Sequence, residues 1–426
     1  MLFLVEMWER FCYYGMRAIF VLYMVQSLRF STEKAGNIYG IYTGLVYLTP
    51  LLGGYLADRY FGQRRCVAYG SILICLGLFA LSVEIHWLFY TALVLMIFGN
   101  GFFKANISTI LGKLYGDDMS KRDAGYTIFY MGINLGALFS PLVCGTLAVQ
   151  YGYKYGFMAA GVGMLIGLLT YKLGEKKFLG ASGMPFLKGD RATEHIQDEH
   201  LSSRVGNCPP QELTQKEKTR MLALFLLMFF VISFWIAFEQ AGSSLTLFAE
   251  YSANRFIPFL NFEIPTSWLQ SLNPLYIIIL APLVSVLWTN LAQKGKEPST
   301  VSKFVVGMLL ISLSLFVMVC AASQASVEKV ALVWLLAVYF IQTVAELCIS
   351  PVGLSLVSKL APAKFASLMM GTWFLSSFFG NLIAGFFAGQ YDLIEHTKFF
   401  LILALWTLIA AIALFSLRKI LTKWME

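Results

Sequence analysis

The sequence predicts an all-α membrane protein with twelve transmembrane helices in two six-helix bundles, and three observations lead to this fold class. Of the 426 residues, 58% are apolar and only 13% are charged, about half the charged share of an average globular protein. Apolar segments long enough to cross roughly 30 Å of hydrocarbon, at about 20 residues each, occur twelve times. A long polar stretch divides these segments six and six. Because lipid covers apolar surface that a soluble protein would have to bury, this composition favours a membrane protein.

The twelve apolar segments cover approximately residues 2–28, 36–57, 66–84, 87–113, 124–150, 153–173, 220–249, 266–292, 301–322, 328–359, 365–389 and 394–417. The longest polar stretch, 174–219, contains no apolar run that could cross a bilayer. We therefore expect an N-terminal six-helix bundle over 1–173, a cytoplasmic linker over 174–219 and a C-terminal six-helix bundle over 220–426.

The basic residues indicate the orientation in the membrane. The loops after even-numbered spans and the C-terminal tail hold 23 Lys and Arg, the loops after odd-numbered spans hold six, and three lie inside spans, which accounts for all 32. Since basic loops stay in the cytoplasm, we expect a multi-pass protein of the plasma (inner) membrane with both termini inside. Their position in short loops also argues against nucleic-acid binding, although the net charge is +8. This plan is that of major-facilitator-type transporters, whose substrate site lies between the halves.

Seven ionisable residues lie within the predicted spans. A charge at a helix centre costs roughly 2.5–3.5 kcal/mol, so these side chains must be paired, hydrated in a cavity or neutralised. Four acids face three bases, which leaves one carboxylate for a proton or a substrate amine. The four histidines lie in loops or at span ends, so a proton-coupled carrier would bind its protons on carboxylates. The seven residues are Glu6, Glu9, Arg10, Arg17, Lys104, Glu239 and Glu346.

The first span carries a polar and aromatic stripe. Its residues are spaced so that they share one helical face, and we expect this face to border a cavity. The alternative is that Arg17 reaches an interface and that the glutamates only fix helix packing. The stripe consists of Glu6, Arg10, Tyr13, Tyr14 and Arg17, with Glu9 beside it.

The three remaining intramembrane charges stand more alone. Lys104 lies late in the fourth span, Glu239 in the seventh and Glu346 in the tenth, five residues before Pro351. The proline is expected to kink or break that helix. The alternatives are a structural salt bridge for Lys104, a packing contact for Glu239 and a partner for a cytoplasmic base for Glu346.

Several blocks resemble one known family. The segment Glu6–Gly15 resembles the ExxERFxYYG motif of the proton-dependent oligopeptide transporter family, and further blocks in both halves are similar to segments of the same family. Ala105 departs from the pattern, because the family usually has a proline there. The further blocks are Gly99–Ser108, Arg122–Gly125 with Phe129–Gly136, and Glu346–Gly353, while Gly54–Arg59 with Gly62–Arg65 resembles the cytoplasmic loop motif of major facilitators.

The resemblance implies proton-coupled symport of di- and tripeptides into the cytoplasm by alternating access, with the proton as coupling ion and no other cofactor. It implies that Arg17 and Lys104 receive the peptide carboxylate and that Glu346 receives the amine. Lys104 and Glu239 match a gating pair between the halves. The proton-coupling set that the resemblance implies is Glu6, Glu9, Arg10 and Glu239.

The resemblance also implies a set of pocket-lining residues, Tyr14, Tyr47, Asn134, Trp235, Asn273 and Trp373. For the two tryptophans the alternative is packing against lipid or the protein core. Asp58 and Arg59 are expected to form a latch between the cytoplasmic ends of helices. The alternative is that the basic residues here only set the orientation in the membrane, which explains Arg64 and Arg65 better than it explains the acidic Asp58.

Two other functions remain open from the sequence. One is a carrier for another small anion or a drug-like solute, and the other is a nutrient-sensing receptor that binds peptide without moving it. No nucleophile–base or metal-binding constellation supports an enzyme. The expected partners are the lipid bilayer, short peptides and protons, and a monomer is expected to suffice.

Overall fold

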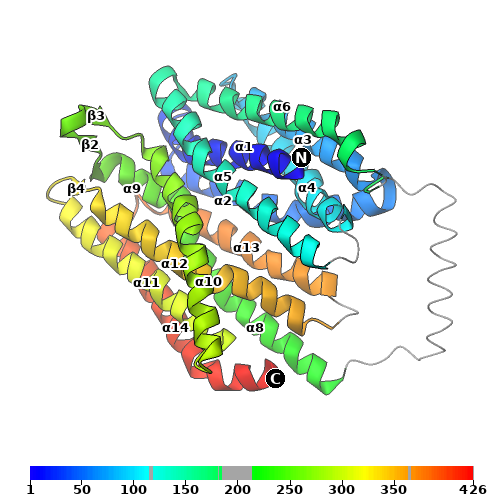
Figure 1. Ribbon diagram of the computed structural model, residues 1–426. Helices are drawn as coiled ribbons and strands as arrows, with labels where there is room; N and C mark the ends of the chain where they lie inside the picture. Colours follow the sequence, from blue (N-terminus) through cyan, green and yellow to red (C-terminus); the bar gives the residue numbers. More distant parts are fainter. Residues whose placement is uncertain (115–118, 181, 185–213, 363–365, 426) are drawn as a thin grey trace.

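The computed structural model describes residues 1–114, 119–180, 182–184, 214–362 and 366–425, and the described chain is dominated by long helices (Figure 1). The N-terminal half, coloured blue to teal, holds six long helices. A π-helical turn over Tyr23–Ser27 extends the first, and another over Ala57–Phe61 extends the second. These helices are α1 (Leu2–Leu22), α2 (Thr32–Leu56), α3 (Gln63–Leu81), α4 (His86–Leu114), α5 (Met119–Tyr151) and α6 (Tyr153–Phe178).

The C-terminal half, coloured green to red in Figure 1, contains six long helices and the short α9. Four two-residue strands pair as β1 with β4 and as β2 with β3. The helices are α8 (Gln215–Phe238), α9 (Ser244–Ser252), α10 (Leu272–Gln293), α11 (Thr300–Ala325), α12 (Val333–Leu360), α13 (Ala366–Gly389) and α14 (His396–Met425). The 3₁₀ turns cover Glu239–Gly242, Pro258–Leu260 and Thr266–Ser271, and the strands are β1 (Ala253–Asn254), β2 (Phe256–Ile257), β3 (Phe262–Glu263) and β4 (Val330–Ala331).

The predicted fold class is confirmed, since each of the twelve predicted spans coincides with a long helix. Of these, ten are long and apolar enough to cross a membrane within the described part of the chain. The other two are α1 and α2. Four charged residues lie in α1, and the glycines, tyrosines and polar residues of α2 lower its mean hydropathy. These two helices face the other half of the protein, where a less lipid-like surface is tolerated. Most of the proposed linker, residues 174–219, lies outside the described part of the chain, and its two ends overlap α6 and α8.

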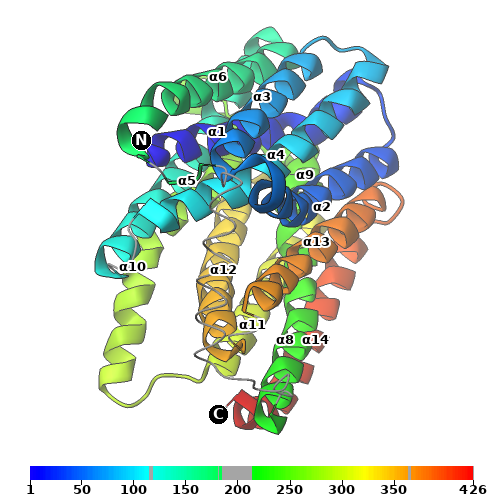
Figure 2. The ribbon, with the colours of Figure 1, turned by 90° about the vertical axis from the view of Figure 1, so that its right-hand side faces the viewer.

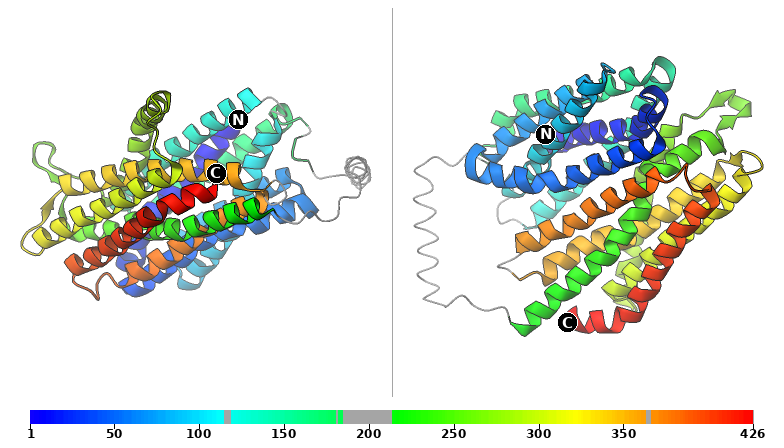
Figure 3. Two further views of the ribbon diagram at one scale, coloured as in Figure 1. Left: turned by 90° about the horizontal axis from the view of Figure 1, so that it is seen from below. Right: turned by 180° about the vertical axis from the view of Figure 1, so that it is seen from behind.

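Each half packs mainly within itself. In the N-terminal half α1 packs on α5 and α6, and α3 packs on α4. In the C-terminal half α11 packs on α12 and α14, and α8 packs on α13 and α14. Figure 2 shows the halves one above the other, and Figure 3 shows them from below and from behind. The halves meet along two seams, one between α2 and α13 and the other between α5 and α10 with its preceding 3₁₀ turn.

The seam between α2 and α13 depends on small residues. A Cβ atom added to Gly40 would lie 2.7 Å from the Cα of Gly385, and one added to Gly36 would lie 2.4 Å from the backbone N of Gly389. Such distances leave no room for a side chain, so the glycines allow the two backbones to touch. This contact holds the halves together near the C-terminal end of α13.

The two ends of the molecule differ. We call the end that carries β1–β4 the hairpin end and the opposite one, with Met1 and Met425, the terminal end (Figure 3). At the hairpin end the side chain of Thr32 donates to Asp392, and Trp268 Nε1 donates to Thr146 Oγ1 at 2.9 Å. Ser271 Oγ donates to the carbonyl of Leu138 at 2.7 Å. These bonds join the N-terminal half to the C-terminal half, so the hairpin end is closed.

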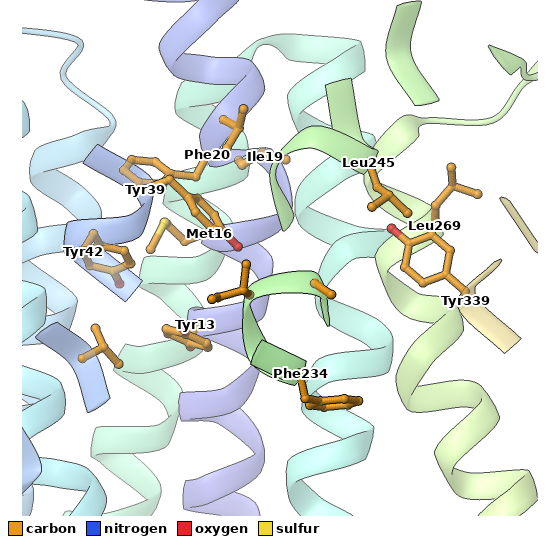
Figure 4. Close-up of a cluster of buried hydrophobic side chains, with 14 of the residues drawn as sticks. Tyr13, Met16, Ile19, Phe20, Tyr39, Tyr42, Phe234, Leu245, Leu269 and Tyr339 are labelled. Atoms are coloured by element: carbon orange, nitrogen blue, oxygen red, sulfur yellow. The ribbon is translucent and has the colours of Figure 1, made fainter. Parts of the chain in front are cut away.

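Aromatic side chains fill the core where the halves approach each other (Figure 4). Tyr13 and Phe20 come from α1, and Tyr39 and Tyr42 come from α2, all of them buried. Phe20 packs edge-on against Tyr42 with ring centroids 5.5 Å apart. Phe234 of α8 joins the cluster from the other half. This packing positions α1 and α2 against the site described next.

Candidate functional site

A cavity of about 170 Å³ lies between the two halves. Its walls come from α1, α2 and α5 on one side and from α8, α10, α12 and their adjoining turns on the other. The lining is mainly aromatic and amide, with one base and two acids. It consists of Tyr14, Arg17, Tyr47, Tyr130, Ile133, Asn134, Ala137, Trp235, Phe238, Glu239, Ala241, Gln270, Asn273, Pro274, Ile277, Tyr339, Gln342 and Glu346.

An ion pair across the halves closes one side of this cavity. Arg17 Nη2 lies 2.5 Å from Glu239 Oε2, and Arg17 Nε donates to the hydroxyl of Tyr39 at 2.6 Å. Both charged side chains are buried. Helix α8 ends at Phe238, so the carboxylate sits on the following 3₁₀ turn, where it points at α1. The predicted pairing of Glu239 with Lys104 is therefore wrong for this conformation, because Arg17 occupies the position of the base.

The opposite wall presents a second carboxylate. Asn273 Nδ2 donates to Glu346 Oε2 at 2.9 Å and to Thr343 Oγ1 at 3.1 Å. These bonds join α10 to α12 and fix the orientation of the carboxylate. Helix α12 runs through Pro351 to Leu360 without a break, so of the two expected outcomes, a kink or a break, the break does not occur.

Lys104 lies behind the cavity wall. Its Nζ is 4.3 Å from the ring centroid of Tyr47, and Tyr47 itself lines the cavity. The electrostatic environment of Lys104 includes Arg10, Glu9, Glu6 and Glu239. The ammonium group thus stands between the charges of α1 and the cavity, with an aromatic ring in front of it.

The first-helix charges form a buried network inside the N-terminal half. Arg10 Nε lies 2.5 Å from Glu9 Oε2 and 3.3 Å from Glu6 Oε1, and Asn100 Nδ2 donates to Glu9 Oε1 at 3.0 Å. All three charged residues are at most 4% exposed. Within the described residues, Glu6 Oε2 and Arg10 Nη2 have no hydrogen-bond partner. The charges are paired, as expected, but one carboxylate oxygen and one guanidinium nitrogen of the network make no hydrogen bond within the described residues.

The predicted single cavity face on α1 is only partly right. Tyr14 and Arg17 line the central cavity, whereas Glu6 and Arg10 are buried between helices. Tyr13 borders a separate cavity of about 10 Å³ together with Glu9 and other residues. That volume is about enough for one water molecule. The face therefore splits into a cavity-lining part and a part embedded in the bundle.

The remaining predicted residues divide between the cavity and other places. Tyr47, Asn134, Trp235 and Asn273 line the cavity. Trp373 does not, because its ring stacks edge-on against Phe304 and fills the space next to Gly353. The expected role of Trp373 in the pocket is thus wrong here, and core packing, the alternative, describes it.

The predicted latch residues lie at the terminal end. Gln63 Nε2 donates to Asp58 Oδ1 at 2.9 Å, and Arg59 Nη1 donates to the hydroxyl of Tyr55 at 2.7 Å. Arg64 Nη2 donates to the carbonyl of Gly180 at 2.5 Å, which ties α3 to the chain after α6. These bonds fasten elements of one half to each other. The side chains of the Arg122–Asp123 block lie outside the described residues.

Several residues that reasoning from sequence missed contribute to the site, and four of them are polar side chains on α2, α5 and α12. Tyr39 accepts the bond from Arg17, and Tyr130, Tyr339 and Gln342 line the cavity. Gln342 precedes Glu346 by one helical turn on α12, so the spacing of i and i+4 could have found it. Tyr130 also borders a second cavity of about 460 Å³ among α10, α11 and α12, toward the terminal end.

Comparison with known proteins gives consistent results. A family model described as the POT family matches residues 64–185 and 190–402. An uncharacterised transporter of Bacillus subtilis (strain 168), YclF, is 38% identical over 94% of this chain and 89% of its own length. The peptide transporter YePEPT of Yersinia enterocolitica is 35% identical over 91% of this chain and 86% of its own length. A crystal structure of a peptide transporter POT with sulfate superposes with a TM-score of 0.89 at 33% identity, covering all of this chain and 94% of that one.

Proposed function

The chain belongs to the POT family of membrane transporters, and we propose that it carries di- and tripeptides together with protons into the cytoplasm by alternating access. The observation that carries the proposal is the pair of opposite charges facing one cavity. Arg17 reaches it from the N-terminal half and Glu346 from the C-terminal half. A short peptide is a zwitterion, so it needs a cation for one end and an anion for the other.

In this proposal the peptide carboxylate binds near Arg17 and the peptide amine binds Glu346. Lys104 strengthens the positive end from behind Tyr47. Tyr14, Tyr47 and Trp235 supply apolar area for side chains of different shape, and the amides of the wall supply hydrogen bonds. Such a lining fits a carrier that accepts many peptides.

The ion pair between Arg17 and Glu239 serves as the gate. An arriving peptide carboxylate competes with Glu239 for Arg17, and a proton on Glu239 removes the charge that holds the pair together. Either event weakens a contact that joins the halves at the cavity. The halves can then rock, as alternating access requires.

Protons bind carboxylates, because the four histidines lie in loops or at span ends. Glu6, Glu9 and Arg10 form the coupling network on the same helix as Arg17. Each net positive charge that moves inward gains about 2.3 kcal/mol per 100 mV of membrane potential, which is enough to concentrate a peptide about fiftyfold.

The orientation follows from the basic loops. The terminal end faces the cytoplasm, the hairpin end faces outward, and the protein resides in the plasma (inner) membrane. The closed hairpin end then corresponds to a conformation open to the cytoplasm. Residues 174–219 act as the linker between the halves. One chain suffices for transport, and no cofactor other than the proton is needed.

Flux in proteoliposomes tests the proposal. Purified protein is reconstituted with a pH gradient that is acidic outside, and uptake of labelled Ala-Ala is measured with an excess of unlabelled dipeptide, amino acid or nitrate. We expect accumulation that collapses with a protonophore and that only di- and tripeptides suppress. Suppression by nitrate or amino acids instead would favour a different anion carrier, and binding without flux would favour a receptor.

A further inference from the structure

One polar side chain of the central cavity has no hydrogen-bond partner among the described residues. Gln342 lies on α12 and is 1% exposed, and within the described part of the protein neither its Nε2 nor its Oε1 has a hydrogen-bond partner. The residue nevertheless lines the cavity. Buried polar groups are nearly always hydrogen-bonded, so an amide with both ends unused calls for a partner.

The other amides of the cavity wall differ from Gln342. Asn134 Nδ2 donates to the carbonyl of Tyr130 at 3.0 Å, and Gln270 Nε2 donates to Thr246 Oγ1 at 3.1 Å. Asn273 Nδ2 donates to Glu346 and Thr343. Their donors are occupied by the protein itself. Gln342 keeps both a donor and an acceptor for something that enters the cavity.

The position of Gln342 limits what that partner is. Glu346 follows one turn later on the same helix, and Arg17 stands on the facing half. In the proposed function these two charges hold the two ends of the peptide. Tyr339, one turn before Gln342 on α12, donates to the carbonyl of Ala241 on the 3₁₀ turn that carries Glu239, the partner of Arg17. Gln342 thus lies on α12 between the Arg17 end of the cavity and Glu346, so it faces the middle of the substrate, where a dipeptide has its peptide bond.

A carboxamide and a peptide bond are complementary. The side chain of Gln342 offers N–H donors and a C=O acceptor, and the peptide bond offers one C=O and one N–H. A free amino acid has no such group. We propose, on the basis of the proposed function, that Gln342 binds the peptide bond of the substrate and so distinguishes peptides from other zwitterions.

The experiment compares two ligands on each protein. One is Ala-Ala, and the other is its ketomethylene isostere, in which a methylene replaces the amide N–H while both charged ends remain. Competition against a labelled dipeptide gives both affinities for the wild type and for Gln342→Met, which removes the amide at similar side-chain length. Gln342→Glu, which keeps an acceptor and loses the donors, is the second variant.

The wild type is expected to prefer Ala-Ala by about five- to tenfold, the worth of one hydrogen bond. In Gln342→Met that preference should shrink to less than about twofold, because Ala-Ala loses the bonds to both its N–H and its C=O whereas the isostere loses only the bond to its C=O. Gln342→Glu should retain part of the preference through its acceptor. If Gln342→Met does not fold, Gln342→Leu, which also removes both the donor and the acceptor, gives the ratio that decides the matter.

An equal loss of both ligands would mean a structural role and would overturn the proposal. An unchanged preference would do so too, because a water molecule would then satisfy the amide. If the wild type bound neither ligand, the proposed function itself would fail. A wild type that binds Ala-Ala without preferring it to the isostere would instead overturn only the role proposed for Gln342.

Discussion

Helix α1 carries two ion networks that differ in the halves they join. Glu6, Glu9 and Arg10 bind one another and Asn100, all within the N-terminal half. Arg17, two turns further along, binds Glu239 of the C-terminal half. Both networks are buried on one helix, but only the second crosses the boundary between the halves.

This difference predicts a separate role for each of the two networks. When the halves rock as rigid bodies, contacts inside one half keep their geometry and contacts between halves must break. In the proposed transport cycle, the Arg17–Glu239 pair is therefore the place where substrate and proton change the conformation. The Glu6–Glu9–Arg10 network can respond to a proton without losing its neighbours. Variants of each network test this division.

The largest effect is expected at the pair between the halves. Arg17→Ala removes the cation of the cavity and leaves Glu239 buried without its partner. In the proposed complex Arg17 pairs with the peptide carboxylate. Losing one member of such a charge pair costs about 2–5 kcal/mol, so the affinity for Ala-Ala should fall about a hundredfold. Competition binding on purified protein measures this loss, and proton-driven uptake should disappear with it.

Glu239→Gln separates binding from coupling at the same pair. It keeps the shape of the side chain and leaves Arg17 free for the peptide carboxylate, so binding should persist while uptake no longer follows the pH gradient. Lys154→Ala, an exposed base at the hairpin end, is the matched control and should behave as wild type. Wild-type uptake by Arg17→Ala would contradict the gate.

A smaller effect is expected inside the N-terminal half. Glu9→Gln removes a charge from the Glu6–Glu9–Arg10 network and preserves its acceptor for Asn100. Proton-driven accumulation of Ala-Ala should fall about tenfold, the low end of the worth of one hydrogen bond to a charged group. Exchange of internal for external dipeptide, which needs no net proton movement, should stay within about twofold.

These two assays are run on the same proteoliposomes, so the ratio of accumulation to exchange does not depend on the amount of folded protein. If Glu9→Gln accumulated dipeptide at the full rate, its role in coupling would have to be given up. If exchange fell as much as accumulation, the network would be structural, and the division between the two networks on α1 would not hold.

The glycine seam gives a third test, on a contact between the halves that carries no charge. Gly40→Ala places a Cβ 2.7 Å from the Cα of Gly385 and should oppose closure of the hairpin end. Overpacking of this kind costs about 1–3 kcal/mol, so uptake should fall at least about fivefold. Gly54→Ala is the control, because its Cβ would meet only Ala105 Cβ, at 3.7 Å. Equal uptake by both variants would mean that the seam does not move.

Much of the fold was predictable, because a lipid-spanning helix needs a long apolar run and little else. The twelve segments follow from that one requirement. Of the kink or break expected at Pro351, the break did not occur, since neighbouring groups in a membrane protein can compensate for a missing donor. Nothing in the sequence periodicity indicated the close approach of α2 and α13 at Gly40 and Gly385.

The residues that belong to the site were largely predictable, but the ion pairs that they form were less so. Intramembrane charge is costly, which singled out Arg17, Glu239 and Glu346, and all three line the cavity. Which base pairs with Glu239 depends on the rotation of α1 against the 3₁₀ turn after α8, a tertiary property. Tryptophan carries no charge that must be satisfied, so Trp373 could be placed in the pocket or in the core with equal ease.

The smallest effect is expected at an ion pair that lies within one half and near its surface. Glu297, in the loop between α10 and α11, accepts a bond from Lys303 Nζ at 2.5 Å, which lowers the pKa of its carboxyl group. A lowered pKa stabilises the folded state above the ordinary carboxyl value of about 4.3, and the stabilisation is lost as the pH falls through the lowered pKa. Glu297→Gln should thus lower the melting temperature in detergent by about 1 °C at pH 7 and not at pH 3. Its uptake should match the wild type, and a clear loss would show that pairs within one half also control the transport cycle.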